Sequence, residues 1–206
     1  MPLQNRVTPD ARIVAENWRG TMMGNRGGRI HDPETKTLLK RKWASRRWIV
    51  CVTQFKERQR EVMGHSYTEL FFLDEVTAFA AGHRPCFECR RKDAKDYAER
   101  WVALFGRPDG SMADAMDLQL HTERTGKAHE IAIDELPNLP DGAILQSGDL
   151  FFSRKDGRYL QWTGTGYKAL AIDELRLPER PKCLTPASTL AILGHGYQPQ
   201  WHQSAR

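Results

Sequence analysis

One short motif constrains the fold of this chain more than any other feature. Cys86 and Cys89 are separated by two residues in the segment 84–91, RPCFECRR. Two thiols at this spacing can bind one tetrahedral ion, and zinc is the expected metal. We expect the pair at the start of a helix, with Pro85 in its first turn, because a helix N-terminus and nearby arginines favour the thiolate form. The motif therefore predicts half of a zinc site.

Two other interpretations of these cysteines stay open. A redox C-x-x-C usually lies in a thioredoxin-like βαβ unit, and the sequence around Cys86 does not show that pattern. Alternatively, the two thiols are only structural. The chain has four cysteines in 206 residues, Cys51, Cys86, Cys89 and Cys183, which are too few and too scattered for a disulfide scaffold.

The composition is that of a soluble globular protein. Hydrophobic residues make up 40% and charged residues 28%, which argues against disordered and collagen-like classes. The mean hydropathy of -0.62 agrees with this interpretation. No apolar run reaches the length of a membrane span, and residues 1–10 lack the apolar segment of a secretory signal. We expect a cytoplasmic protein with no membrane partner.

The basic residues are concentrated in the first third of the chain. The net charge is +5, yet residues 1–62 hold 14 Lys/Arg and 6 Asp/Glu, whereas residues 63–206 hold 17 and 20. Such an asymmetry is typical of a surface that faces a polyanion, although a solvated basic face would look the same.

The pattern of residues predicts an α+β protein: a zinc-binding hairpin-and-helix module followed by a β-rich C-terminal subdomain. A boundary near residue 125 divides it into 1–125, with a basic N-terminal segment, and 126–206, which ends in a short helix. We expect the glycine and arginine cluster 19–29 to be a flexible surface loop and regular structure to begin near Trp48. The expected elements are a hairpin of 48–55 with 60–63, a strand at 69–73, helices at 74–81, 94–105 and 113–122, a hairpin over 150–162 around Asp156-Gly157, and a helix from 185 to 193.

The stretch from Phe71 to Arg91 resembles part of the metal-binding domain of Ada-type DNA alkylation repair proteins. The shared pattern is a strand, a short helix and Ala-Ala-Gly-x-Arg-Pro-Cys-x-x-Cys, found here at 80–89. That family binds zinc through four cysteines, so the resemblance implies that Cys86 and Cys89 are its second ligand pair. The family's first pair is Cys-x-x-x-Cys, one member of which accepts a methyl group from a DNA phosphotriester. This sequence offers Cys51 in its place.

Further ligands are needed to complete the site. Cys51 and His121 are our candidates, while His31, His65 and His83 are weaker ones. His121 and Glu123 form a His-x-Glu pair, the ligand and acid/base set of zinc deaminases, although it follows the cysteines here by about thirty residues. Two cysteines and His121 would leave the fourth position for water, with Glu123 as general base.

Three functions are compatible with these features. The first is a zinc-binding, nucleic-acid-associated protein, DNA-binding or repair-like, with Trp43 and Trp48 available for stacking on a single strand. Its expected phosphate contacts are Arg26, Arg29, Arg41, Arg46, Arg47, Arg84, Arg90 and Arg91. The second is a zinc-dependent hydrolase or deaminase that uses a metal-bound water. The third is a structural zinc module that presents a protein-interaction surface.

Overall fold

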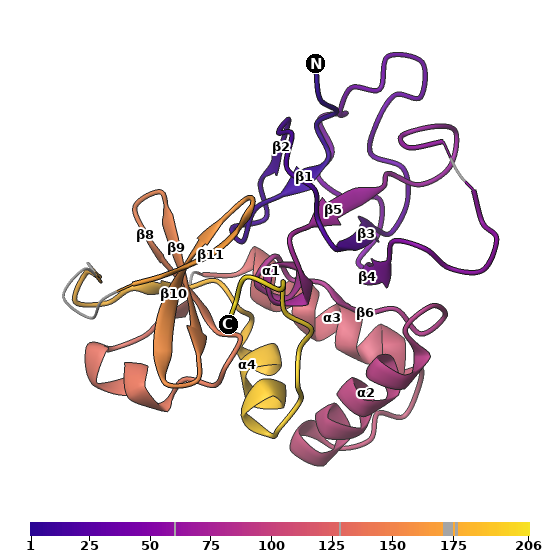
Figure 1. Cartoon of the computed structure of the whole chain (residues 1–206). Helices are drawn as coiled ribbons and strands as arrows, with labels where there is room; N and C mark the ends of the chain where they lie inside the picture. The colour runs from indigo at the N-terminus through magenta and orange to yellow at the C-terminus, as the bar shows by residue number, and fades with distance from the viewer. Residues whose placement is uncertain (60, 128, 171–174, 176) are drawn as a thin grey trace.

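The computed structural model describes residues 1–59, 61–127, 129–170, 175 and 177–206. Within them the chain is a mixed α+β protein with two six-stranded sheets (Figure 1). The strands are β1 Arg6–Val7, β2 Ile13–Val14, β3 Met22–Arg26, β4 Trp48–Val52, β5 Leu70–Phe72, β6 Arg84–Pro85, β7 His129–Glu130, β8 Ile144–Ser147, β9 Leu150–Lys155, β10 Arg158–Thr163, β11 Gly166–Ala169 and β12 Lys182–Cys183. The helices are α1 Glu75–Ala80, α2 Arg91–Phe105, α3 Met112–Thr125, the 3-10 helix η1 Ile133–Asn138 and α4 Ala187–Gly194.

The first sheet has the order β2-β1-β5-β3-β4-β6. Strand β3 lies antiparallel to both β5 and β4, and β4 continues in parallel to β6. Gly24 is at the centre of β3, where a Cβ atom would lie 2.2 Å from the carbonyl oxygen of Ile49. Glycine at this position therefore allows β3 and β4 to approach closely.

The second sheet has the order β11-β10-β9-β8-β12-β7, and it contains the strands drawn in orange in Figure 1. Strands β9 and β10 form the expected hairpin, with Arg158 opposite Lys155. Asp156 and Gly157 both have positive φ angles, 49° and 76°, as a two-residue type I′ turn requires.

Helix α1 lies between the two sheets, and all six of its residues are buried. Phe79 packs in the core of the first sheet with Val50, Phe72 and Tyr97. Val76 packs with Phe151, Trp162 and other residues of the second sheet. Asp74 caps the helix, since its carboxylate accepts a hydrogen bond of 2.9 Å from the Thr77 N–H. A short helix with two apolar faces thus joins the two sheets.

Most of the expected regular elements are confirmed. Strand β5 and helices α1, α2, α3 and α4 lie where the apolar spacing predicts them, with α3 longer than expected at both ends. None of the helices in the described part of the chain has the length and apolarity that crossing a lipid bilayer requires. The proposed boundary near residue 125 stays a prediction.

Two expectations for the N-terminal part are wrong. Strand β4 does not form a hairpin with the segment after it, because its partners are β3 and β6. The cluster 19–29, expected as a flexible loop, contains β3 in the interior of the sheet, and regular structure begins at β1 rather than near Trp48. Both errors arise because pairing with a glycine-containing strand more than twenty residues away leaves little trace in local sequence patterns.

Candidate metal centre

Parallel pairing of β4 with β6 places Cys51 beside Cys86. Val50 is opposite Pro85 in this register, and the N–H of Cys86 donates a 3.0 Å hydrogen bond to the carbonyl oxygen of Val50. Pro85 is therefore the end of a short strand, and not in the first turn of a helix as expected. Cys51 follows Val50 and Cys86 follows Pro85, so the two cysteine side chains leave the neighbouring strands at adjacent positions.

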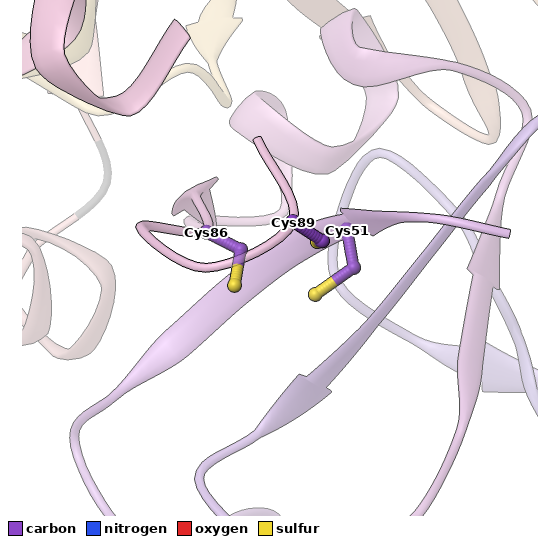
Figure 2. A group of neighbouring side chains, drawn as sticks. All are labelled: Cys51, Cys86 and Cys89. Atoms are coloured by element: carbon purple, nitrogen blue, oxygen red, sulfur yellow. The ribbon is translucent and has the colours of Figure 1, made fainter. Parts of the chain in front are cut away.

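A tight turn then brings Cys89 back to the same point. The Arg90 N–H donates to the carbonyl oxygen of Cys86 at 3.0 Å, and the Glu88 N–H approaches the Cys86 sulfur at 3.4 Å. The sulfur atoms of Cys51, Cys86 and Cys89 all lie within 4.8 Å of one another, and Figure 2 shows the three side chains converging. Tetrahedral zinc with bonds of about 2.3 Å separates its sulfur ligands by about 3.8 Å, so this cluster could hold such an ion after a small adjustment.

The arginines on either side of the motif fix its position. Arg84 makes a bidentate pair with Asp117 of α3, with distances of 2.9 Å from Nε and 2.7 Å from Nη2. Arg90 bonds Glu75 of α1 at 2.6 Å and Asp93 at 2.7 Å. Both guanidinium groups are buried. These two arginines therefore hold the cysteine loop against α1 and α3, and their burial and pairing leave them off the surface on which phosphate contacts are expected.

The three thiols influence one another's protonation. The pKa of Cys86 is lowered, first because the Cys51 and Cys89 thiols donate hydrogen bonds to its sulfur. The pKa of Cys51 is raised, mainly by the same contacts and by burial. These directions favour one thiolate in the absence of metal, and a bound cation would favour loss of the remaining protons.

A cavity of about 270 Å³ lies next to the cysteines, and all three line it. The alternating side chains of three strands form its base, namely Met23 and Asn25 of β3, Ile49 and Cys51 of β4, and Glu69 and Phe71 at β5. The remaining face of each strand, which includes Val50, Leu70 and Phe72, packs in the core. The cavity is therefore on the side of the first sheet opposite the core, and Phe55, Val62 and Tyr67, which follow β4 in the chain, also line it.

Glu69 is the unexpected residue in this cavity. Its side chain is buried, with 4% of the residue exposed. Oε2 accepts a 2.9 Å hydrogen bond from the Met63 N–H, whereas Oε1 has no hydrogen-bond partner among the described residues. The sequence contains one signal that could have identified it. Glu69 is two residues before Phe71 at the start of an apolar run, so the two side chains are expected on the same face of the strand.

The structure places the expected His-x-Glu pair elsewhere. Neither His121 nor Glu123 lines the cavity beside the cysteines. His121 packs edge-on against Trp43, and its Nδ1 lies 3.3 Å from Nη2 of Arg124. Glu123 accepts hydrogen bonds from the N–H and Oγ of Ser188, in the first turn of α4. Glu123 thus joins α3 to α4, while His121 contacts the segment that precedes β4.

The three weaker histidine candidates are also outside the cluster. His31 is buried and bonds Thr68 and the carbonyl oxygen of Gly64. His65 is exposed and lies 3.9 Å from Glu34. His83 is fully buried against Trp48 and Phe72, with no hydrogen-bond partner at either ring nitrogen within the described chain. Cys51 is thus the candidate that the fold brings to the Cys86–Cys89 pair.

The other expected phosphate contacts divide into buried and exposed residues. Arg26 is buried, with its guanidinium carbon 4.1 Å from the ring centroid of Trp48. Trp48 is itself buried and is not available for stacking on a nucleic-acid base, whereas Trp43 is 37% exposed. The exposed arginines of the expected set are Arg29, Arg41, Arg46, Arg47 and Arg91.

Comparisons with known proteins give no family for this chain: no protein-family model, no curated protein and no solved structure matches it. The resemblance of residues 71–91 to Ada-type zinc domains therefore stays a prediction.

Proposed function

We propose that the protein is a zinc-dependent hydrolase or deaminase whose metal is held by Cys51, Cys86 and Cys89. One observation carries the proposal: the three thiols and the buried Glu69 carboxylate line the same cavity. A closed structural site would surround the ion with four protein ligands, whereas catalytic zinc sites keep one position for water or substrate. Three clustered thiols facing a cavity match the second arrangement.

The three thiols and the Glu69 carboxylate are a set of groups with known zinc chemistry. When bound, zinc supplies a Lewis acid that makes a coordinated water more acidic. Three cysteine ligands together with a glutamate that is not a ligand is one of the sets used by zinc nucleobase deaminases. In this proposal Glu69, rather than Glu123, takes the proton of the attacking water and returns it to the leaving group. The cavity volume suits a small polar substrate, or one base of a larger one.

The test compares two glutamates that line the cavity. Glu69→Gln should keep the zinc content and the free energy of unfolding close to wild type and abolish ammonia release from a panel of nucleobases and nucleosides. Glu88→Gln is the control, because Glu88 is exposed and bonds Arg58 at the rim. Turnover of the Glu69→Gln variant equal to that of wild type would show that Glu69 does not transfer the proton.

A second measurement does not depend on knowing the substrate. Cobalt-substituted protein should change its visible spectrum on addition of azide if the fourth position is open to the cavity. An unchanged spectrum, together with no turnover on any substrate of the panel, would leave the zinc a structural role only.

The second candidate function is association with nucleic acid. The observation that favours it is the exposed basic segment 40–47, which contains Lys40, Arg41, Lys42, Arg46 and Arg47. The resemblance to Ada-type domains supports the same assignment. Binding to labelled DNA and RNA should be detectable at low salt and weaken steeply as salt is added, since each neutralised phosphate releases counterions. Absence of binding to either polymer at low salt would end this proposal.

A further inference from the structure

A second cavity lies on the opposite face of the first sheet from the cysteines. Trp48 and Arg26 line it, and their positions alternate with those of Ile49 and Asn25, which line the metal cavity. This second cavity, which we call the basic groove, has a volume of about 1080 Å³. Six cationic side chains line it: Arg12, Arg26, Lys40, Arg41, Lys42 and Arg124. The single carboxylate among its lining residues is Asp10, which already bonds Arg12 at 2.6 Å.

Two of these cations lack a carboxylate within ion-pair distance: Arg26, which is buried, and Arg124, which is half-buried. The guanidinium carbons of Arg26 and Arg124 each lie 4.1 Å from the ring centroid of Trp48. No ion pair among the described residues includes either side chain, although the charge of Asp117, which pairs with Arg84, acts on Arg124 from a greater distance. Arg26 instead donates to the Ala11 carbonyl oxygen at 2.8 Å, and Arg124 to those of Gly82 and Arg46. Burial, together with the charge of Arg124, lowers the pKa of Arg26 to about 9.

Three donors at this position are unused. Nε of Arg26, Nε of Arg124 and Nε1 of Trp48 are buried and have no hydrogen-bond partner among the described residues. Buried cations and donors without partners are costly, and stacking on an indole ring offsets only part of that cost. A phosphate in the groove would provide the missing charge, and a small shift of the two guanidinium groups toward it would give their donors an acceptor.

The rim of the groove adds a stacking surface. Trp43 lines the groove and is 37% exposed, next to Lys42 and Arg41. Exposed aromatic rings beside a row of cations are the elements with which proteins bind single-stranded nucleic acid without sequence preference. The groove is also far larger than one phosphate needs, which favours a chain of phosphates over a single anion.

We propose that the basic groove binds the backbone of a single-stranded nucleic acid, with one phosphate at Arg26 and Arg124 and a base stacked on Trp43. The proposal rests on the second candidate function and specifies where that function's contact lies. It is independent of the metal site, which opens on the other face of the sheet.

The test measures anisotropy of labelled oligonucleotides of about 15 nucleotides, DNA and RNA, across a salt series. Lys40→Ala/Lys42→Ala should weaken binding about tenfold or more and reduce the slope of log affinity against log salt by about 1.4. Lys92→Ala/Lys95→Ala on the exposed face of α2 removes the same charge elsewhere and should bind like wild type. All four lysines are exposed or on the surface of the groove, so these variants should fold.

Stacking is tested separately. Trp43→Ala should weaken binding about fivefold or more, and Trp43→Phe should retain most of it, because a smaller ring still stacks. Leu39→Ala is the control, since Leu39 is an exposed apolar residue of the same groove.

The outcomes distinguish the proposal that the protein binds nucleic acid from the proposal that the basic groove is the binding site. If the wild type binds and the Lys40/Lys42 variant binds equally well, nucleic-acid association stands and the groove is not its site. If the wild type binds neither DNA nor RNA at low salt, both nucleic-acid association and the assignment of the basic groove are wrong. If polyglutamate displaces the oligonucleotide at equal charge and Trp43→Ala has no effect, the groove takes acidic polypeptides and the nucleic-acid proposal is overturned.

Discussion

Cys51 and Cys86 stand at equivalent positions on two parallel strands, each one residue beyond the register pair of Val50 and Pro85. The two residues are far apart in the sequence, yet one backbone hydrogen bond, from the Cys86 N–H to the Val50 carbonyl oxygen, fixes their relation. The three-cysteine cluster, which could hold a metal ion, is therefore assembled by the sheet, with the C-x-x-C turn adding the third thiol.

Replacing Cys51 should remove the metal. Cys51→Ser is expected to reduce the zinc content from about one ion per chain to nearly none, because an alcohol is a poor ligand in a thiolate site. Elemental analysis of purified protein is the measurement. Cys183→Ser is the matched control, since Cys183 is also buried but lies in the second sheet, at β12. Equal zinc in the two variants would contradict the three-cysteine centre.

The ion pair between Arg84 and Asp117 should be needed for both folding and metal binding. Both side chains are almost fully buried, at 4% and 3% exposure, so Asp117→Asn leaves a buried guanidinium without its counter-charge. We expect a loss of about 3–5 kcal/mol in the free energy of unfolding and weaker zinc binding, because Arg84 adjoins the cysteine loop.

The control for this change is on the same helix. Asp114 is exposed and pairs with Arg47, so Asp114→Asn should leave stability and zinc affinity nearly unchanged. Urea unfolding and zinc competition with a chelator measure both quantities. A small effect of Asp117→Asn on both would show that the pair does not hold the loop.

Gly24 should tolerate no side chain. In Gly24→Ala the new Cβ would meet the Ile49 carbonyl oxygen at 2.2 Å, so β3 and β4 must separate. We expect about 1–3 kcal/mol of destabilisation by urea unfolding, and weaker zinc binding because β4 carries Cys51. Gly110→Ala is the control, as nothing lies within 4 Å of the Cβ atom there. Equal stability of the two variants would contradict the close packing of β3 on β4.

The sequence predicts what is encoded locally. The Asp156-Gly157 turn identifies the β9–β10 hairpin, and the apolar spacing of Ala94, Tyr97 and Trp101 identifies α2, because the short-range pattern itself determines these elements. Cys86 and Cys89 are found for the same reason. Pairing between β3 and β4 depends on contacts distant in the chain, so local patterns do not predict that the segment around Gly24 is a strand. The role of Glu69 is not predicted, because burial of a carboxylate depends on the whole sheet.

The ring of His83 is buried between Trp48 and Phe72. Burial, reinforced by the charges of Arg26 and Arg124, lowers its pKa well below 6.5. Between the lowered pKa and 6.5 the unfolded chain binds a proton that the folded chain does not, so this histidine makes the free energy of unfolding fall as the pH drops. The contribution is at most about 1.4 kcal/mol per pH unit.

His83→Phe should fold, because the histidine ring nitrogens have no described hydrogen-bond partner to lose. It should also flatten the decline in stability from pH 6.5 to 5, relative to wild type. Urea unfolding of both proteins at equal zinc loading measures the two stability curves. Protonation of the cysteine ligands affects both proteins equally, so it cancels in the difference between the curves. His65→Gln is the control, since the exposed His65 should not alter the slope. Parallel stability curves for wild type and His83→Phe would mean that His83 is protonated equally in the folded and unfolded states.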